Sequence, residues 1–182
     1  MPIYISMLRG INVGGHKRIK MDRLRESFEA LGFERVKTYI QSGNVVFQAG
    51  KISISGLSGK IEERILSDFG FSVSVISRTS DEMGKLIADN PFLKERGIDL
   101  EKLHVTFLSA APAPAALKKL ADLTVAPDRF HCFGKQIYFH LPNGVSGSVL
   151  MKSPVDRVLA VVPTTRNWRT VNQLYAMCQD CR

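Results

Sequence analysis

The residue types best suited to binding a ligand begin in LRGINVGGHKRIKM, residues 8–21. Glycines let a backbone expose its N–H groups, and a helix beginning near Lys20 would add its dipole, so this segment could bind an anion. The alternative is a strand-to-helix connection in which Asn12 folds back onto its own backbone and the cations are solvated. The predicted ligand-binding residues here are Arg9, Gly10, Asn12, Gly14, Gly15 and Lys17.

Two further polar segments are candidates for the same site. Gln41, Ser42 and Asn44 flank a predicted hairpin turn, where amides and hydroxyls can orient a polar ligand; as an alternative, Ser-Gly-Asn is also ordinary turn sequence. Arg166 offers a planar fork for a carboxylate or phosphate, Asn167 can cap a helix, and Trp168 offers a ring face. A single tryptophan is, however, more often part of a core.

Known phosphate-binding motifs do not fit the glycine segment. Gly10 and Gly15 have the spacing of a P-loop, but His16 follows where the lysine is required. The G-x-G-x-x-G pattern of dinucleotide-binding folds is also absent. Ser42 lacks a G-x-S-x-G context and a histidine placed to activate it. We therefore predict no catalytic residue and no cofactor, and whether any reaction is catalysed stays open.

The cysteines and histidines give little support for a redox or metal site. Cys178 and Cys181 form a C-x-x-C at a predicted helix C-terminus, whereas redox pairs use a helix N-terminus. A zinc site would require His131 and Cys132 to converge with these two cysteines. We expect no metal. The three cysteines are too few for a disulfide framework, which fits a reducing compartment.

The composition indicates a globular protein with a localised positive charge. The chain has 182 residues, 45% of them hydrophobic, and a formal net charge of +8. Six basic residues and one acidic residue lie in 1–25, five and two lie in 151–182, and the remainder balances. If the fold joins the two ends, they form one positive surface. No membrane span or secretory leader is predicted, so we expect a cytoplasmic protein.

The order of predicted elements indicates an α+β fold with two similar halves. In the first half, strands are predicted at 3–8, 36–40, 44–48 and 71–76, and helices at 21–31 and 57–69. This βαββαβ order is that of a ferredoxin-like unit. The second half reads βαββα, with strands at 103–109, 129–133 and 136–141 and a helix opened by Pro112 or Pro114 after the first of them. A short helix opening at Ser153-Pro154, a turn at 164–167 and a final helix follow.

We therefore predict two ferredoxin-like subdomains of the βαββαβ type in tandem. The predicted boundaries are 1–78 for the N-terminal subdomain, 79–102 for a connecting helix and linker, and 103–182 for the C-terminal subdomain with its final helix. Ser80 is the predicted N-cap of the connecting helix. The strands at 3–8 and 103–109 are expected to be central in their sheets.

Several of these segments together resemble the bacterial DUF1697 family, a domain of unknown function. LRGINVGG and QSGNVVF carry the resemblance, and NPF, HVTFL, YFHLPNG and TTRNWRTV follow at similar spacing over nearly the whole chain. The resemblance implies two α+β subdomains and no established activity. This chain departs from the family pattern at Gly147 and Val149, where an arginine and a lysine are common. If those cations contact a ligand elsewhere in the family, Gly147 and Val149 cannot make that contact here.

These observations favour a protein that binds an anionic or nucleotide-like small ligand at the glycine segment, the Gln41 hairpin and the Arg166 turn. One alternative is a single-stranded nucleic-acid-binding module, because βαββαβ is also the topology of the RNA recognition motif. Its third strand should carry two aromatic residues, yet residues 43–47 carry one and no cation. A further alternative is a protein-interaction module without a ligand. The oligomeric state stays open.

Overall fold

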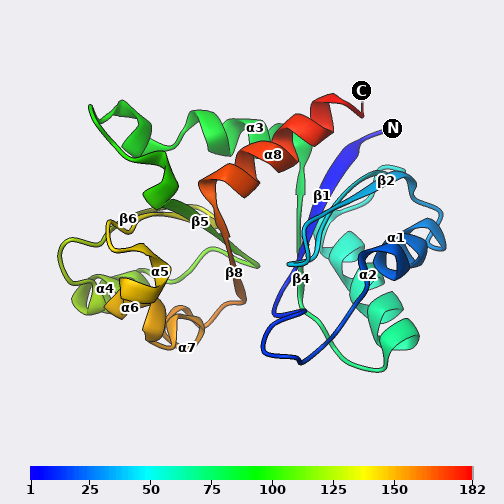
Figure 1. Cartoon of the computed structure of the whole chain (residues 1–182), viewed down its shortest axis with the longest axis horizontal. Coiled ribbons are helices and arrows are strands. Elements are labelled where there is room, and N and C mark those ends of the chain that lie inside the picture. The colour runs from blue at the N-terminus through cyan, green and yellow to red at the C-terminus, as the bar shows by residue number, and fades with distance from the viewer. Residues whose placement is uncertain (182) are drawn as a thin grey trace. The chain divides into compact units, whose positions relative to one another are not determined.

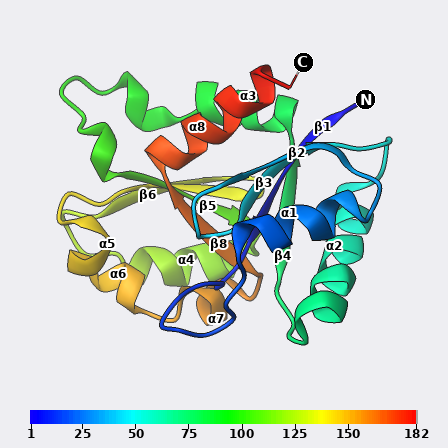
Figure 2. The ribbon, with the colours of Figure 1, turned by 45° about the vertical axis from the view of Figure 1, so that its right-hand side comes forward.

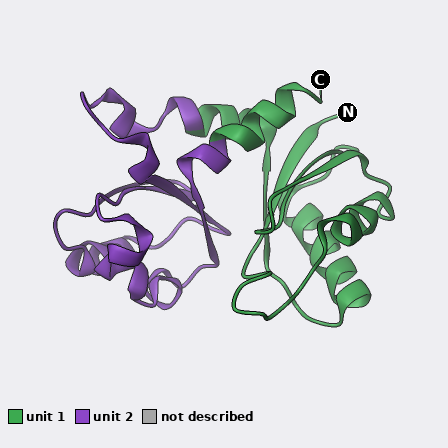
Figure 3. Cartoon of the chain, in the orientation of Figure 1, with its two compact units in different colours: residues 1–86, 172–182 green, residues 87–171 purple. Residues whose placement is uncertain are grey.

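The computed structural model of the protein describes residues 1–181. It contains two four-stranded antiparallel sheets with helices between the strands (Figure 1). This is an α+β fold of two tandem ferredoxin-like subdomains, which confirms the predicted fold class. Residue contacts group the chain into unit 1, Met1–Leu86 with Asn172–Arg182, and unit 2, Ile87–Val171 (Figure 3). The division into domains at residues 78 and 103 is a statement about separately folding parts of the chain, which contact grouping does not address, and it stays a prediction.

Unit 1 is a complete βαββαβ unit. Its sheet has the order β2-β3-β1-β4, so β1 is central, as predicted. Its elements are β1 (Ile3–Leu8), α1 (Met21–Glu29), β2 (Glu34–Tyr39), β3 (Asn44–Gln48), α2 (Ile54–Phe69) and β4 (Val75–Thr79), followed by α3 (Ser80–Ala88). The left-handed Gly70, with φ of 75°, ends α2 where the sequence predicts its end.

The core of unit 1 lies between one face of its sheet and the helices α1 and α2. Figures 1 and 2 both show these two helices on the same face of the sheet. Phe28 of α1 packs edge-on against Phe47 of β3, with ring centroids 5.2 Å apart, and Tyr4 of β1 stacks on Phe47 at 6.0 Å. All three side chains belong to one buried cluster. Alternate residues of each strand therefore point towards the helices.

The fourth strand lies further along the chain than its sequence pattern indicates. A strand was predicted at 71–76, but β4 spans Val75–Thr79 and includes the buried Ser77 and Arg78. The Ser77 hydroxyl lies 2.8 Å from the Ser6 hydroxyl and accepts a hydrogen bond from Ser58 of α2. The predicted bounds were wrong because these hydrogen bonds permit polar residues to be buried in the strand.

The first turn of α3 is capped by Thr79 rather than by the predicted Ser80. The Glu82 amide donates to the Thr79 hydroxyl at 3.1 Å, and the Thr79 amide donates to the Glu82 carboxylate at 2.8 Å. This reciprocal pair is a capping box, and it places the cap one residue earlier than predicted.

Unit 2 repeats the same topology. Its sheet has the order β6-β7-β5-β8, so β5 is central, as predicted. Its elements are the 3₁₀ helices η1 (Pro91–Lys94) and η2 (Leu100–Lys102), then β5 (Leu103–Leu108), α4 (Pro114–Leu123), β6 (Arg129–Phe133), β7 (Gln136–His140), α5 (Gly144–Gly147), α6 (Val149–Lys152), α7 (Val155–Leu159) and β8 (Pro163–Asn167). The last helix, α8 (Trp168–Gln179), contributes residues to both units.

The second half possesses a fourth strand that the sequence pattern did not predict. Residues 164–167 were predicted to form a turn, but β8 pairs with β5 in antiparallel register, with Val105 opposite Arg166. The hydroxyls of Thr106 and Thr165 lie 2.7 Å apart across this pair. The strand β8 is short and polar, so its sequence shows no alternation of apolar and polar residues. Its pairing with β5 is what makes this segment a strand.

Candidate ligand-binding site

The glycine loop, defined here as residues 9–20, connects β1 to α1 through an unusual backbone. Five of its residues have positive φ: Gly10 at 67°, Asn12 at 55°, Gly14 at 57°, Gly15 at 77° and Lys17 at 47°. Glycine adopts this region without steric cost, and asparagine adopts it more readily than most other residues. The glycine content of the loop is therefore required by the path of the chain.

Asn12 holds the loop closed. Its Nδ2 donates to the backbone oxygens of Ile19, at 3.0 Å, and Gln41, at 2.8 Å, while its Oδ1 accepts from the Ile19 amide at 2.9 Å. The side chain thus folds back onto the chain, as the structural alternative predicted. It also joins the loop to the β2–β3 hairpin, so two of the three predicted segments meet.

The hairpin turn is built by its own polar residues. The buried Asn44 donates through Nδ2 to the Tyr39 oxygen and to the Ser42 hydroxyl, both at 3.0 Å. Gly43 has φ of 78°, and a Cβ at this position would lie 2.6 Å from Ile11 Cδ1. Ser42 and Asn44 therefore hold the turn together, while the Gln41 side chain is exposed.

A cavity of about 770 Å³ opens where the loop, the hairpin and the start of α1 meet. We call it the α1 cavity. It is lined by Asn12, Gly15, Arg18, Ile19, Lys20, Met21, Asp22 and Gln41. Of the predicted site residues, the α1 cavity brings together Asn12, Gly15 and Gln41.

The α1 cavity is electropositive. Arg18 and Lys20 are exposed, and within residues 1–181 neither side chain makes a hydrogen bond or an ion pair. The carboxylate in the lining, that of Asp22, pairs with Arg25 rather than with these cations, with Asp22 Oδ1 lying 3.6 Å from Arg25 Nη2. Lys20 occupies the N-cap position of α1 without a side-chain capping bond, so no side chain satisfies the first-turn N–H groups there. Arg18 and Lys20 contribute to the positive charge of residues 1–25, but neither was among the predicted site residues. The spacing of cations along a sequence does not reveal which of them line a cavity.

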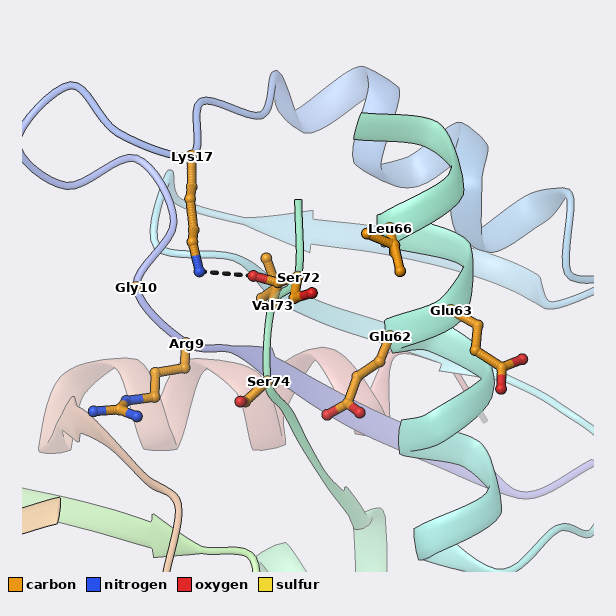
Figure 4. Close-up of a pocket in the computed structure, with 9 residues that line it drawn as sticks. All are labelled: Arg9, Gly10, Lys17, Glu62, Glu63, Leu66, Ser72, Val73 and Ser74. Carbon is orange, nitrogen blue, oxygen red and sulfur yellow. Dashed lines mark hydrogen bonds between the residues drawn. The ribbon is translucent and has the colours of Figure 1, made fainter. Parts of the chain in front are cut away.

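A second cavity of about 610 Å³ lies on another side of the loop, between the loop and α2 (Figure 4). We call it the α2 cavity. Lys17 Nζ donates to the Ser72 oxygen at 2.6 Å, and Glu62 Oε1 accepts from the Val75 amide at 2.7 Å. Its other lining residues are Arg9, Gly10, Glu63, Leu66, Val73 and Ser74. The predicted residues Arg9, Gly10 and Lys17 therefore line a cavity of mixed charge.

The third predicted segment forms the end of β8 and the start of α8. Arg166 is buried, and its Nη1 donates to the Thr164 hydroxyl and the Thr165 oxygen, both at 2.9 Å. Burial lowers the pKa of Arg166 to about 10. Asn167 Oδ1 accepts from the Thr170 amide at 2.8 Å, and Trp168 is buried. Convergence of these residues with the glycine loop would join two units and stays a prediction.

Among the described residues, neither a metal-ligand cluster nor a membrane-spanning helix is found. No group of three or more His, Cys, Asp or Glu side chains in residues 1–181 is arranged to hold a metal ion. Cys178 and Cys181 are buried and form no disulfide, and burial raises the pKa of Cys132. Across this same part of the chain, no helix is long and apolar enough to cross a membrane.

A nucleic-acid-binding platform of the RNA-recognition type is not present on the first sheet. Such a platform requires exposed aromatic rings on the first and third strands. Tyr4 and Phe47 are the aromatic residues of β1 and β3, and both are buried on the helix-covered face.

Comparisons with known proteins place the chain in a family and a fold. The model of a family described as a protein of unknown function, DUF1697, matches residues 1–138. No curated protein matches the chain. A solved structure of a conserved bacterial protein from Streptococcus pneumoniae is similar with a TM-score of 0.78 and 24% identity, covering 97% of this chain and 98% of that one. At this identity the likeness shows the fold alone. The chain belongs to the DUF1697 family.

Proposed function

We propose that the protein binds a small anionic ligand, such as a nucleotide or another phosphate-bearing compound, in the α1 cavity. The observation that carries this proposal is the pair of cations Arg18 and Lys20, without partners in residues 1–181, beside a helix start that lacks a side-chain cap. An anion there would receive hydrogen bonds from both side chains and from the N–H groups of α1.

The size and remaining chemistry of the α1 cavity support a ligand larger than a bare ion. Its volume of about 770 Å³ is within the range that small-molecule sites occupy. The exposed Gln41 amide supplies a donor and an acceptor for a polar group away from the anion. Without a nucleophile or an acid–base pair in its lining, the site would contribute positioning and charge stabilisation to any reaction.

Arg166 is not included in this proposal, although the sequence suggested it. Its Nη1 already donates to two acceptors of its own strand, and the side chain is buried. A structural role explains these contacts without a ligand. The glycine loop and the hairpin are therefore the proposed site.

Calorimetric titration of the full chain with inorganic phosphate and with adenosine monophosphate tests the proposal. We expect Arg18→Ala and Lys20→Ala each to weaken binding about tenfold, since each removes one charge-assisted hydrogen bond. Arg96→Ala is the matched control, because Arg96 is an exposed arginine of unit 2 outside the cavity lining. Equal affinities in all three variants, or no binding at low ionic strength, would contradict the proposal.

The same titration separates a compact anion site from a nucleic-acid surface. A protein that neutralises many phosphates loses affinity steeply as salt rises, in proportion to the number of phosphates contacted. We expect a shallow dependence for adenosine monophosphate and no binding of single-stranded RNA. Tight RNA binding with a steep salt dependence would favour the nucleic-acid alternative.

A further inference from the structure

Two cations, Arg9 and Lys17, and two carboxylates, Glu62 and Glu63, line the α2 cavity, and one of each sign is bonded to an end of a short chain segment. Lys17 reaches from the glycine loop to the oxygen of Ser72, and Glu62 reaches from α2 to the amide of Val75. Figure 4 shows Lys17 and Glu62 on opposite sides of this segment, whereas Arg9 and Glu63 point away from it. The opposite charges therefore line one cavity and are held apart by backbone contacts.

Both charged groups retain capacity for a ligand. The Lys17 ammonium has three N–H donors and gives one to Ser72, while the bond from Val75 goes to one of the two Glu62 oxygens. An anion alone would be repelled by Glu62, and a cation alone would be repelled by Lys17. A zwitterion satisfies both groups, with its carboxylate at Lys17 and its ammonium at Glu62.

The separation of the two backbone groups that hold Lys17 and Glu62 is a guide to the length of the zwitterion. Two residues, Val73 and Ser74, separate the bonded carbonyl of Ser72 from the bonded amide of Val75. Two extended residues span at most about 7 Å. The ammonium and the carboxylate of a free dipeptide are separated by the same number of residues. Leu66, 49% exposed, adds an apolar surface to the cavity for a side chain.

We propose that the α2 cavity binds a dipeptide or a zwitterion of similar length, oriented by Lys17 and Glu62. Ser72 and Ser74 also line the cavity, and their hydroxyls can bond the peptide group of the ligand. This site is separate from the anion site in the α1 cavity, and neither proposal depends on the other.

Binding of three matched probes to the full chain, measured by calorimetry, tests this inference. The probes are glycyl-leucine, its N-acetylated form without the ammonium, and its C-terminal amide without the carboxylate. We expect glycyl-leucine to bind at least about tenfold more tightly than either blocked form, since each blocked form loses one charge-assisted contact. Equal binding of all three probes, or no binding of glycyl-leucine, overturns the proposal.

Two conservative variants connect the discrimination to the named residues. Glu62→Gln keeps an oxygen for the Val75 amide, so the fold is retained, and this variant should bind glycyl-leucine no better than its N-acetylated form. Lys17→Gln should likewise lose discrimination between glycyl-leucine and its amide, which tests the other end independently. Glu101→Gln, at an exposed position outside the cavity, is the control. Unchanged discrimination in both cavity variants refutes the assignment, and Arg18→Ala should leave dipeptide binding intact.

Discussion

Asn12 in the glycine loop donates a hydrogen bond of 2.8 Å to the backbone oxygen of Gln41 in the neighbouring hairpin. Two more bonds connect the same side chain to Ile19, just before α1. One side-chain amide therefore fixes both ends of the glycine loop and the hairpin relative to one another. Together with the start of α1, the loop and the hairpin line the α1 cavity.

Replacing Asn12 should destabilise unit 1. Asn12→Ala removes three hydrogen bonds and leaves Ile19 and Gln41 without these partners, so we expect the free energy of unfolding to fall by about 2–3 kcal/mol. Chemical denaturation followed by circular dichroism measures the change. Asn12→Gly accepts the positive φ and should lose nearly as much. A fully stable glycine variant would show instead that backbone strain causes the alanine effect.

Gly43 should not tolerate a side chain. A Cβ would lie 2.6 Å from Ile11 Cδ1 and 2.9 Å from Leu8 Cβ, and φ is 78°. We expect Gly43→Ala to lower the free energy of unfolding by about 2–4 kcal/mol, because both overpacking and backbone strain act. Gly50→Ala is the control, since a Cβ there meets nothing within 4 Å. Similar unfolding midpoints for the two variants would argue against this steric role.

Arg166 provides a test of structure against binding. If its role is structural, Arg166→Ala should lower the free energy of unfolding by about 1–3 kcal/mol, since Thr164 and Thr165 lose a donor and a void is left. The exposed Arg169→Ala should change stability by less than about 0.5 kcal/mol. A more stable Arg166→Ala protein with weaker phosphate binding would support the original prediction that Arg166 binds a ligand.

The stability contributed by Asp68 should disappear in acid. Burial raises the pKa of Asp68. Hydrogen bonds from Ser27 and Arg64 and the charges of Arg64 and Arg23 lower it by more than burial raises it, so the net shift of the pKa is downward. Its stabilisation is therefore complete above the unfolded pKa, near 4, and is lost as pH falls through the lower folded value. We expect Asp68→Asn to cost about 1 kcal/mol at pH 7.

A series of denaturation curves from pH 7 to pH 2 checks the sign of this effect. The difference between the original protein and Asp68→Asn should shrink as the carboxylate is protonated in both folded and unfolded states. A difference that grows towards low pH would mean that the folded-state pKa is raised rather than lowered.

Where local sequence sets the backbone, the prediction from sequence alone was accurate. The strand from Ile3 to Leu8 is marked by its apolar and β-branched residues, and the end of α2 is marked by Gly70. The topology of the first half and the central position of β1 follow from the order of these elements. Local propensity and periodicity act within a few residues, so they can be read directly from the chain.

The sequence by itself thus determined the family resemblance, the α+β class and the segment in which a site is expected. Tertiary structure decided the rest. Ser77 and Thr165 belong to strands because they meet hydroxyls 71 and 59 residues away, and no local pattern records such partners. Likewise, the Asn12 side chain in the glycine loop is hydrogen-bonded to the backbone of the chain itself, while Arg18 and Lys20 line the α1 cavity. Which polar groups are used internally and which are left for a ligand depends on contacts between distant segments, and only the folded chain brings those segments together.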